Sequence, residues 1–173
     1  TGSSLFWMDA GGDTGSLLVQ EFFHVSPRET AASLYDKHMV ALDKIVRQAV
    51  ATLADGSARE IYQDESCATY CARRRPADGE IDWGRPAEEI DRLIRAVGRP
   101  YAGAFTHCDQ SRLTVWSSSL ARSSRHNASP GQIVEVDDEA FVVQTGSGTI
   151  RIDEWSMADN KRPRMHAMLS RVT

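Results

Sequence analysis

The chain has 173 residues, of which 41% are hydrophobic and 25% charged, so its length allows one domain or two small ones and its composition excludes disorder as the default state. Its formal net charge of -4 provides no global electrostatic case for binding nucleic acid or an anionic membrane surface. No apolar run reaches the roughly 20 residues that span a bilayer, and residues 1–9 lack the features of a signal peptide, so we expect a cytoplasmic protein without membrane contacts.

Residues 1–20 are predicted to form a strand, a tight turn and a second strand. Apolar residues dominate positions 4–8 and 17–19, and the segment between them holds three glycines and two aspartates. Glycine adopts backbone angles that other residues avoid, which suits a sharp reversal of the chain. Since a chain rarely begins inside such a pattern, we expect these residues to belong to the interior of a domain.

The next predicted element is a helix over residues 27–54. Ser26, Pro27 and Glu29 have the form of a capping box with proline at the first helical position, and Gly56 is a natural stop. Residues at three- and four-residue spacing predict one buried stripe: Leu34, His38, Leu42, Ile45, Ala49 and Leu53. Little sequence precedes this helix, so we expect further chain to cover it.

Residues 57–86 are polar and irregular, and a second helix follows them. Pro86 suits its first turn, Gly98 and Pro100 end it, and apolar residues between them line one face. The pair of Asp91 and Arg95 has the i,i+4 spacing that supports a helix. The sequence therefore predicts a helical linker before the next segment.

From Ala104 onward the hydrophobic period changes to two, which is typical of strands. Turn-forming residues separate the apolar segments. The five candidate strands cover residues 104–108, 112–118, 132–136, 140–145 and 149–155. Short strands joined by tight turns predict a small barrel or an open sandwich, with a loop-like tail at residues 161–164.

The three cysteines are Cys67, Cys71 and Cys108, an odd number that argues against a disulfide scaffold. Cys67 and Cys71 could hold a metal ion, but no second pair with zinc-site spacing follows them. We therefore interpret the cysteines as reduced structural thiols and expect no metal.

Two stretches of the chain resemble one family. The residues T-G at 1–2 and M-D-A-G-G-D-T-G at 8–15 are similar to a segment of folate-dependent formyltransferases, which include methionyl-tRNA formyltransferase and the sugar N-formyltransferases. The residues D-G-E-I-D-W at 78–83, I-R-A at 94–96 and P-Y-A-G-A-F at 100–105 resemble the pattern that links the catalytic domain of this family to its C-terminal barrel.

The resemblance implies an α+β chain in three parts. Residues 1–56 would be the end of a Rossmann-like catalytic domain, residues 57–100 a linker with a helix, and residues 101–173 a small, open, OB-like β-barrel. The family's H-x-S-L-L-P loop, and the asparagine just before its histidine, would precede residue 1. An N-terminal formyltransferase half is therefore the expected partner.

The implied reaction transfers a formyl group from 10-formyltetrahydrofolate to a primary amine. It needs a donor for the developing oxyanion and a group that accepts a proton. By resemblance, Asp13 is the catalytic residue in this chain, and Gly11 and Gly12 lie with it at the folate-binding turn. Asp9 is interpreted as a turn cap, and Trp83 as a packing residue.

The formyl acceptor is predicted to be an amino sugar or another small amine, and the linker looks most similar to the aminoarabinose-type enzymes. Arg74 could bind a phosphate of a nucleotide sugar and Tyr101 could stack on a base or sugar, with a solvated loop and core packing as their alternatives. Residues 101–173 carry eight Lys and Arg and eight Asp and Glu, which disfavours methionyl-tRNA.

A non-catalytic module is the alternative of a different class. Without a folate-binding half, the predicted barrel could serve for binding or dimerisation, and a homodimer is possible. Met157, Met165 and Met168 are candidates for an apolar patch that would support self-association.

Overall fold

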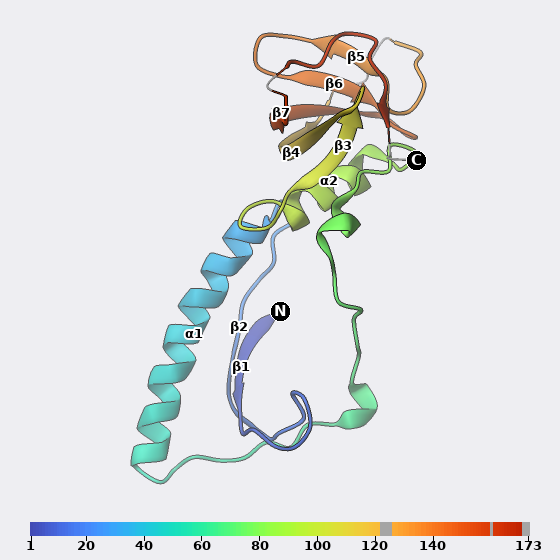
Figure 1. The fold of residues 1–173 in the computed structure, drawn as a ribbon. Coiled ribbons are helices and arrows are strands. Elements are labelled where there is room, and N and C mark those ends of the chain that lie inside the picture. The colour runs from blue at the N-terminus through green and yellow to red at the C-terminus, as the bar shows by residue number, and fades with distance from the viewer. Residues whose placement is uncertain (122–125, 160, 171–173) are drawn as a thin grey trace. The chain divides into compact units, whose positions relative to one another are not determined.

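The computed structural model describes residues 1–121, 126–159 and 161–170 (Figure 1). The chain forms two compact units, residues 1–29 with 33–73 and residues 30–32 with 74–173. The α+β class expected from the sequence is confirmed. The expected barrel range of 101–173 includes residues 122–125, 160 and 171–173, which lie outside the described residues. No described helix is both long and apolar enough to cross a membrane.

The first unit consists of a hairpin and a long helix. Strands β1 and β2 pair antiparallel, with Gly2 opposite Phe22 and Leu5 opposite Val19. Its small core joins Val19 to Ile45 and Ala49 of the helix. The elements are β1 (Gly2–Phe6), β2 (Leu17–Phe22), α1 (Ala31–Ala54) and the short 3-10 helix η1 (Glu65–Cys67).

Helix α1 begins at Ala31 and not at Pro27, so its expected start is wrong. The Glu29 N–H donates to the Ser26 carbonyl at 3.1 Å, and the Glu29 carboxylate accepts from the Ser26 N–H at 2.9 Å. These two hydrogen bonds form half of a capping box. They close a turn over residues 26–29 that precedes the helix and is not part of it.

The Glu29 carboxylate should make the start of α1 sensitive to acid. Hydrogen bonds from the Lys37 ammonium, the Ser33 hydroxyl and the Ser26 N–H lower the pKa of Glu29 from 4.5 to about 2. Because the folded-state pKa is lowered, the stability that ionised Glu29 contributes is complete above pH 4.5 and is lost as the pH falls towards 2.

This expectation can be checked by following the Glu29 side-chain carbonyl in an NMR titration. A midpoint near 2 is expected. In Glu29→Gln, the acid-induced loss of helix signal over that pH range should be smaller. A Glu29 midpoint at the ordinary value of 4.5 would contradict the hydrogen-bonded carboxylate.

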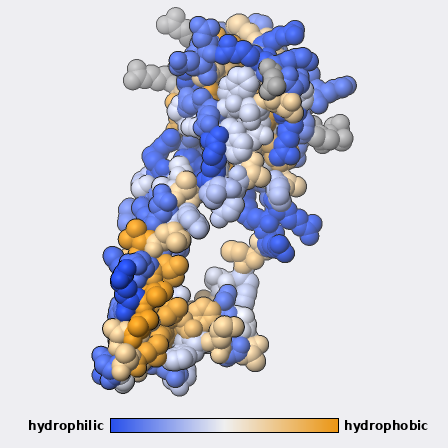
Figure 2. Space-filling view, turned by 60° about the vertical axis from the view of Figure 1, so that its left-hand side comes forward, coloured by the Kyte–Doolittle hydropathy of each residue, from blue (hydrophilic) through white to orange (hydrophobic). Residues whose placement is uncertain are grey.

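The predicted stripe on α1 is only partly correct. Ala41, Ile45 and Ala49 are buried, whereas Leu42 and Leu53 are 42% and 46% exposed. A two-stranded hairpin is narrow, and it covers less of the helix than the predicted stripe requires. Figure 2 shows hydrophobic residues gathered along α1. The exposed apolar residues that recur at three- and four-residue spacing along a second face are Tyr35, Met39, Leu42, Val46, Val50 and Leu53.

The second unit places one helix and a 3-10 turn against a six-stranded sheet. All paired strands of the sheet are antiparallel, in the order β5-β6-β7-β4-β3-β8. The elements are η2 (Pro76–Gly79), α2 (Ala87–Val97), β3 (Ala104–Cys108), β4 (Ser111–Leu120), β5 (Ile133–Val136), β6 (Phe141–Gln144), β7 (Thr149–Met157) and β8 (Leu169–Ser170).

The sheet curls so that the segment leading into β8 reaches the strand at the other edge. Gln132 bridges to Met168, and Ile133 exchanges backbone hydrogen bonds with Ala167 and His166 at 3.0 and 2.9 Å. Strand β8, in turn, pairs with β3. Backbone hydrogen bonding thus continues past both edge strands, which gives the OB-like half-barrel expected for this part of the chain.

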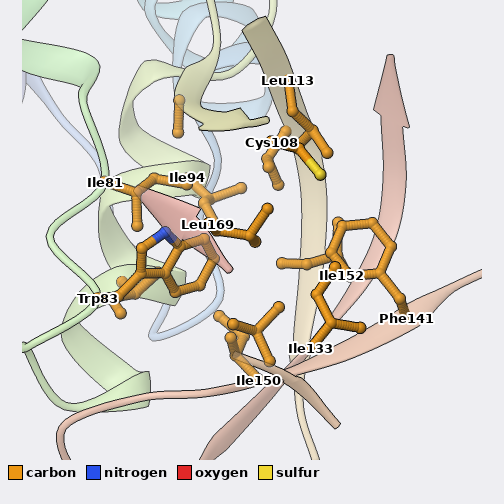
Figure 3. Packing of buried hydrophobic residues seen from close by; sticks show 14 of the residues in the cluster. Ile81, Trp83, Ile94, Cys108, Leu113, Ile133, Phe141, Ile150, Ile152 and Leu169 are labelled. Carbon is orange, nitrogen blue, oxygen red and sulfur yellow. The ribbon is translucent and has the colours of Figure 1, made fainter. Parts of the chain in front are cut away.

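Trp83 lies in the core of the second unit, as its interpretation as a packing residue predicted. It is 5% exposed and is directed into a cluster that includes Ile150 and Leu169 (Figure 3). Its Nε1 donates to the Thr106 hydroxyl at 3.0 Å, which donates to the Ser170 carbonyl at 3.1 Å. The D-W segment therefore fixes the linker to the sheet.

A buried polar contact joins α2 to the sheet. Asp91 is 3% exposed, and it accepts from the Ser118 hydroxyl of β4 at 3.0 Å and from Arg95 at 2.9 Å. The expected pairing of Asp91 with Arg95 is confirmed. Since a buried carboxylate requires such partners, this contact specifies how α2 packs.

Candidate functional site

The turn between β1 and β2 is closed by tight backbone packing. The Trp7 N–H donates to the Ser16 carbonyl at 2.9 Å, and a Cβ added at Gly15 would overlap the Trp7 carbonyl oxygen. Only glycine fits at position 15. The turn therefore has a defined shape although most of its side chains are exposed.

Asp9 caps this turn, as its sequence interpretation predicted. One of its carboxylate oxygens accepts from the Gly11 N–H at 3.0 Å and from the Thr14 hydroxyl at 2.7 Å. A Cβ added at Gly11 would overlap that Thr14 hydroxyl. Gly11 therefore acts inside the turn.

Asp13 has the left-handed backbone conformation, with φ of 64°. Aspartate tolerates this region better than most residues, but it occurs there mainly where the surroundings impose it. The Asp13 carboxylate is exposed, and it accepts no hydrogen bond from the residues that the structure describes. Its oxygens are thus accessible to water or to a bound molecule.

Asp13 and Gly12 line a pocket of about 530 Å³ within the first unit. A Cβ added at Gly12 would meet no atom within 4 Å, so open space lies beside Asp13. The opposite wall comes from the segment after α1. The lining residues are Gly12, Asp13, Thr14, Leu17, Tyr62, Gln63, Asp64, Glu65, Cys67, Ala68, Thr69 and Tyr70. Of the three expected folate-turn residues, Gly11 is the one that does not line this pocket.

The segment after α1 contributes an amide, from Gln63, and two carboxylate residues, Asp64 and Glu65, to the lining of the pocket. The Gln63 Nε2 donates to the Asp13 carbonyl at 2.8 Å and to the Gly15 carbonyl at 2.7 Å. A hydrogen bond from the Ser66 hydroxyl lowers the pKa of Asp64, so this carboxylate is ionised at neutral pH. Sequence reasoning missed Gln63, Tyr62 and Tyr70, because residues 57–86 offered no periodic pattern.

Arg74 and Tyr101, far apart in sequence, lie together in the second unit. They line a pocket of about 430 Å³ formed by η2, the end of α2 and the loop before β3. Arg75 is the other charged residue of its lining, which contains no carboxylate and is otherwise made of small or apolar residues. The lining residues are Arg74, Arg75, Pro76, Gly79, Ala96, Val97, Tyr101, Ala102 and Gly103. Tyr101 is 62% exposed, so core packing does not describe it.

The three cysteines differ in burial. Cys108 is buried, and burial raises the pKa of its thiol, which fits a structural residue. Cys67 and Cys71 are also free thiols, as expected, but both are exposed, so the expectation that they are structural residues holds for Cys108 alone. The expected apolar patch of three methionines does not form, because Met157 belongs to the core whereas Met165 and Met168 are exposed.

Among the described residues, no cluster of three or more His, Cys, Asp or Glu side chains could hold a metal ion.

Known proteins resemble both units. The methionyl-tRNA formyltransferase of Symbiobacterium thermophilum is 35% identical over 155 residues, which cover 89% of this chain and 47% of that protein. This chain therefore spans about half the length of the curated relatives it matches.

Two solved structures share the fold. HypX from Aquifex aeolicus, in complex with tetrahydrofolic acid, superposes with a TM-score of 0.72 and 17% identity over 89% of this chain and 27% of that one. The N-formyltransferase from Helicobacter canadensis, in complex with folinic acid and dTDP-3-aminofucose, gives 0.65 and 19% over 90% and 55%. At these identities the likeness shows the fold alone.

The family itself follows from the sequence match. Residues 74–172, more than half of the chain, match the family model "Formyl transferase, C-terminal domain". This match includes the D-G-E-I-D-W segment and the whole described half-barrel, and it confirms the resemblance noted from the motifs. The chain therefore belongs to the formyltransferase C-terminal domain family.

Proposed function

We propose that this chain is the C-terminal part of an enzyme that transfers a formyl group from 10-formyltetrahydrofolate to a primary amine. The observation that carries the proposal is Asp13, held in a left-handed conformation at the edge of an open pocket of about 530 Å³. The relative with 35% identity over 89% of this chain is a formyltransferase, which supports the same reaction.

Asp13 has a defined task in this proposal. When the amine attacks the formyl carbon, the attacking nitrogen must lose a proton, and an exposed carboxylate beside the pocket can take it up through water. The family resemblance adds an asparagine and a histidine from the N-terminal half, where they would stabilise the oxyanion. Asp13 would then also orient that histidine.

The lining of the pocket supports the proposed co-substrate. Gly12 leaves open space next to Asp13, and the aromatic residues Tyr62 and Tyr70 line the pocket from the opposite wall. Flat ligands pack well on glycine backbone and aromatic faces. In this proposal 10-formyltetrahydrofolate supplies the formyl group, and the turn at residues 9–15 holds the edge of its ring system.

The N-terminal formyltransferase half is the partner that this function requires. The exposed stripe on α1, from Tyr35 to Leu53, is an apolar surface on a helix whose other face packs on β2. Such a surface is typical of a contact with another protein part. We propose that the N-terminal half covers it.

The first candidate acceptor is a small amine carried on a nucleotide. Arg74 and Arg75 line the pocket of about 430 Å³, and in this proposal their guanidinium groups bind a phosphate while the Tyr101 ring stacks on a base or sugar. The Arg74 guanidinium also donates to the Asp78 carbonyl at 3.4 Å. The equal numbers of basic and acidic residues over 101–173 support this candidate, because they give this segment no net positive charge to attract RNA.

Methionyl-tRNA is the second candidate. The observation that favours it is the identity of 34–35% to methionyl-tRNA formyltransferases. The two candidates differ in their dependence on salt, because an acceptor RNA held by several phosphate contacts loses affinity steeply as salt rises.

The proposal can be tested by supplying the missing half. The 173-residue chain alone should release no tetrahydrofolate from 10-formyltetrahydrofolate in the presence of amino sugars, nucleotide-linked amino sugars or methionyl-tRNA. The N-terminal half of the Symbiobacterium thermophilum enzyme, fused to the chain or added in trans, should restore release with one acceptor. Catalytic residues that act together lose far more rate enhancement when some of them are absent than the effect of a single residue would suggest.

The results of this experiment distinguish the two candidate acceptors from each other and the enzyme from a non-catalytic module. Transfer to an amino sugar, with tRNA binding that is weak and insensitive to salt, would support the first candidate. Transfer to methionyl-tRNA with a steep salt dependence would replace it by the second. Inactivity of a folded chimera with every acceptor would contradict the enzyme and favour a binding or dimerisation module.

A further inference from the structure

We infer that Gln63 is a positioning residue for Asp13. It lies on the chain segment that follows α1, 50 residues after the aspartate. Its amide holds the backbone of the turn that carries the proposed proton acceptor. The effect on catalysis rests on the proposed function. The hydrogen bonds from Gln63 to the turn do not, because they are observed in the chain itself.

The contact is double and well formed. Both hydrogens of the Gln63 amide are directed to main-chain carbonyls, those of Asp13 at 2.8 Å and of Gly15 at 2.7 Å. These distances are at the short end for N–H to O hydrogen bonds. The two carbonyls belong to the Asp13–Thr14 and Gly15–Ser16 peptide groups, so one side chain fixes the orientation of two peptide groups on either side of Thr14–Gly15.

Gln63 is itself held in place by the neighbouring backbone. Ile61 and Leu17 exchange two backbone hydrogen bonds of 2.8 and 2.9 Å, and the Ser16 hydroxyl donates to Glu60 at 2.9 Å. Residues 60–63 therefore run beside the start of β2 as a strap, and Gln63 extends this strap to the turn.

The conformation of Asp13 explains why such a contact is needed. With φ at 64°, Asp13 occupies a region that non-glycine residues leave unless their surroundings hold them there. Asp9 caps the first part of the turn through Gly11 and Thr14. Gln63 holds the second part, and between them they fix the direction in which the Asp13 carboxylate enters the pocket.

The test replaces the amide donor and leaves the bulk of the side chain. Gln63→Leu removes both donors at similar size, and Gln63→Glu replaces the donors by a carboxylate that faces two carbonyls. The matched control is Gln20→Leu, since the Gln20 amide donates to the Ser4 hydroxyl of the hairpin, away from the turn. Two readouts are measured, one on the 173-residue chain and one on the chimera with the N-terminal half.

On the chain alone, amide hydrogen exchange at Trp7 and Gly11 reports the turn. Exchange should accelerate by about tenfold or more in both Gln63 variants and stay at the wild-type rate in Gln20→Leu. Unchanged exchange at both amides in both Gln63 variants would overturn the inference. This readout needs no catalysis, so it stands if the proposed function fails.

On the chimera, the expected signature is a split between kcat and KM. A displaced carboxylate should lower kcat by about tenfold or more, with KM for the folate within about threefold of wild type and an unchanged melting temperature. Equal activity of Gln63→Leu and wild type would overturn the inference while leaving formyl transfer intact. A loss of kcat that follows a loss of thermal stability would reduce Gln63 to a structural residue.

Discussion

Asp13→Asn should lower the turnover of the chimera with the N-terminal half by about two to four orders of magnitude, because an amide cannot accept the proton that the amine must lose. Asparagine matches aspartate in size and also tolerates the left-handed conformation, in which Asp13 has φ of 64°. The turn should therefore persist, and folate affinity should stay within about tenfold.

The measurement is single-turnover release of tetrahydrofolate, with folate affinity determined separately. Asp9→Asn is the matched control, because Asp9 accepts hydrogen bonds from Gly11 and Thr14 and an asparagine oxygen can still accept them. We expect its turnover to stay within about tenfold of wild type. Near-normal turnover of Asp13→Asn would remove Asp13 from the reaction.

Trp83→Ala should cost the second unit most of its stability. Truncating a buried tryptophan typically raises the free energy of the folded state by about 3–5 kcal/mol, and native domains are stable by only about 5–15 kcal/mol. Trp83 is 5% exposed, and its loss would also leave the Thr106 hydroxyl without the indole donor at 3.0 Å. Trp83→Phe retains most of the ring and should cost less.

Urea unfolding of the full chain, followed by circular dichroism, provides the comparison. Trp7→Ala is the matched control, since Trp7 is 44% exposed and belongs to the first unit. If Trp83→Ala lowered the free energy of unfolding by less than about 1 kcal/mol, the indole would not be the packing centre that its burial indicates.

The parts of the fold with strong local signals were predictable. Strand β3 occupies residues 104–108 as expected, because Gly103 precedes it and the polar residues Asp109 and Gln110 follow it. Helix α2 ends at Val97 because Gly98 and Pro100 stop it. Strand β8 was missed, since two residues cannot show a period and its pairing with β3 is a long-range contact.

The candidate site was less predictable than the fold. Asp13 could be selected because its segment matches a family motif, and Arg74 and Tyr101 because of their chemistry. Nothing local marked Gln63, a single glutamine in a polar stretch whose partners lie 48 and 50 residues away. Leu42 and Leu53 were predicted to be buried but are exposed. A helical period identifies apolar positions, but it does not say which part of the protein covers them.

The contact of Asp91 with Ser118 also constrains how such a gene could be divided or exchanged by recombination. A crossover placed between α2 and β3 would separate a buried carboxylate from its donor and remove Ile81, Trp83, Ile90 and Ile94 from the cluster that they share with the sheet. A segment that can be exchanged with its core intact therefore begins near residue 74, the start of the main part of the second compact unit. Chimeras joined there would inherit a complete core, and those joined at residue 100 would inherit a half-barrel with an open apolar side.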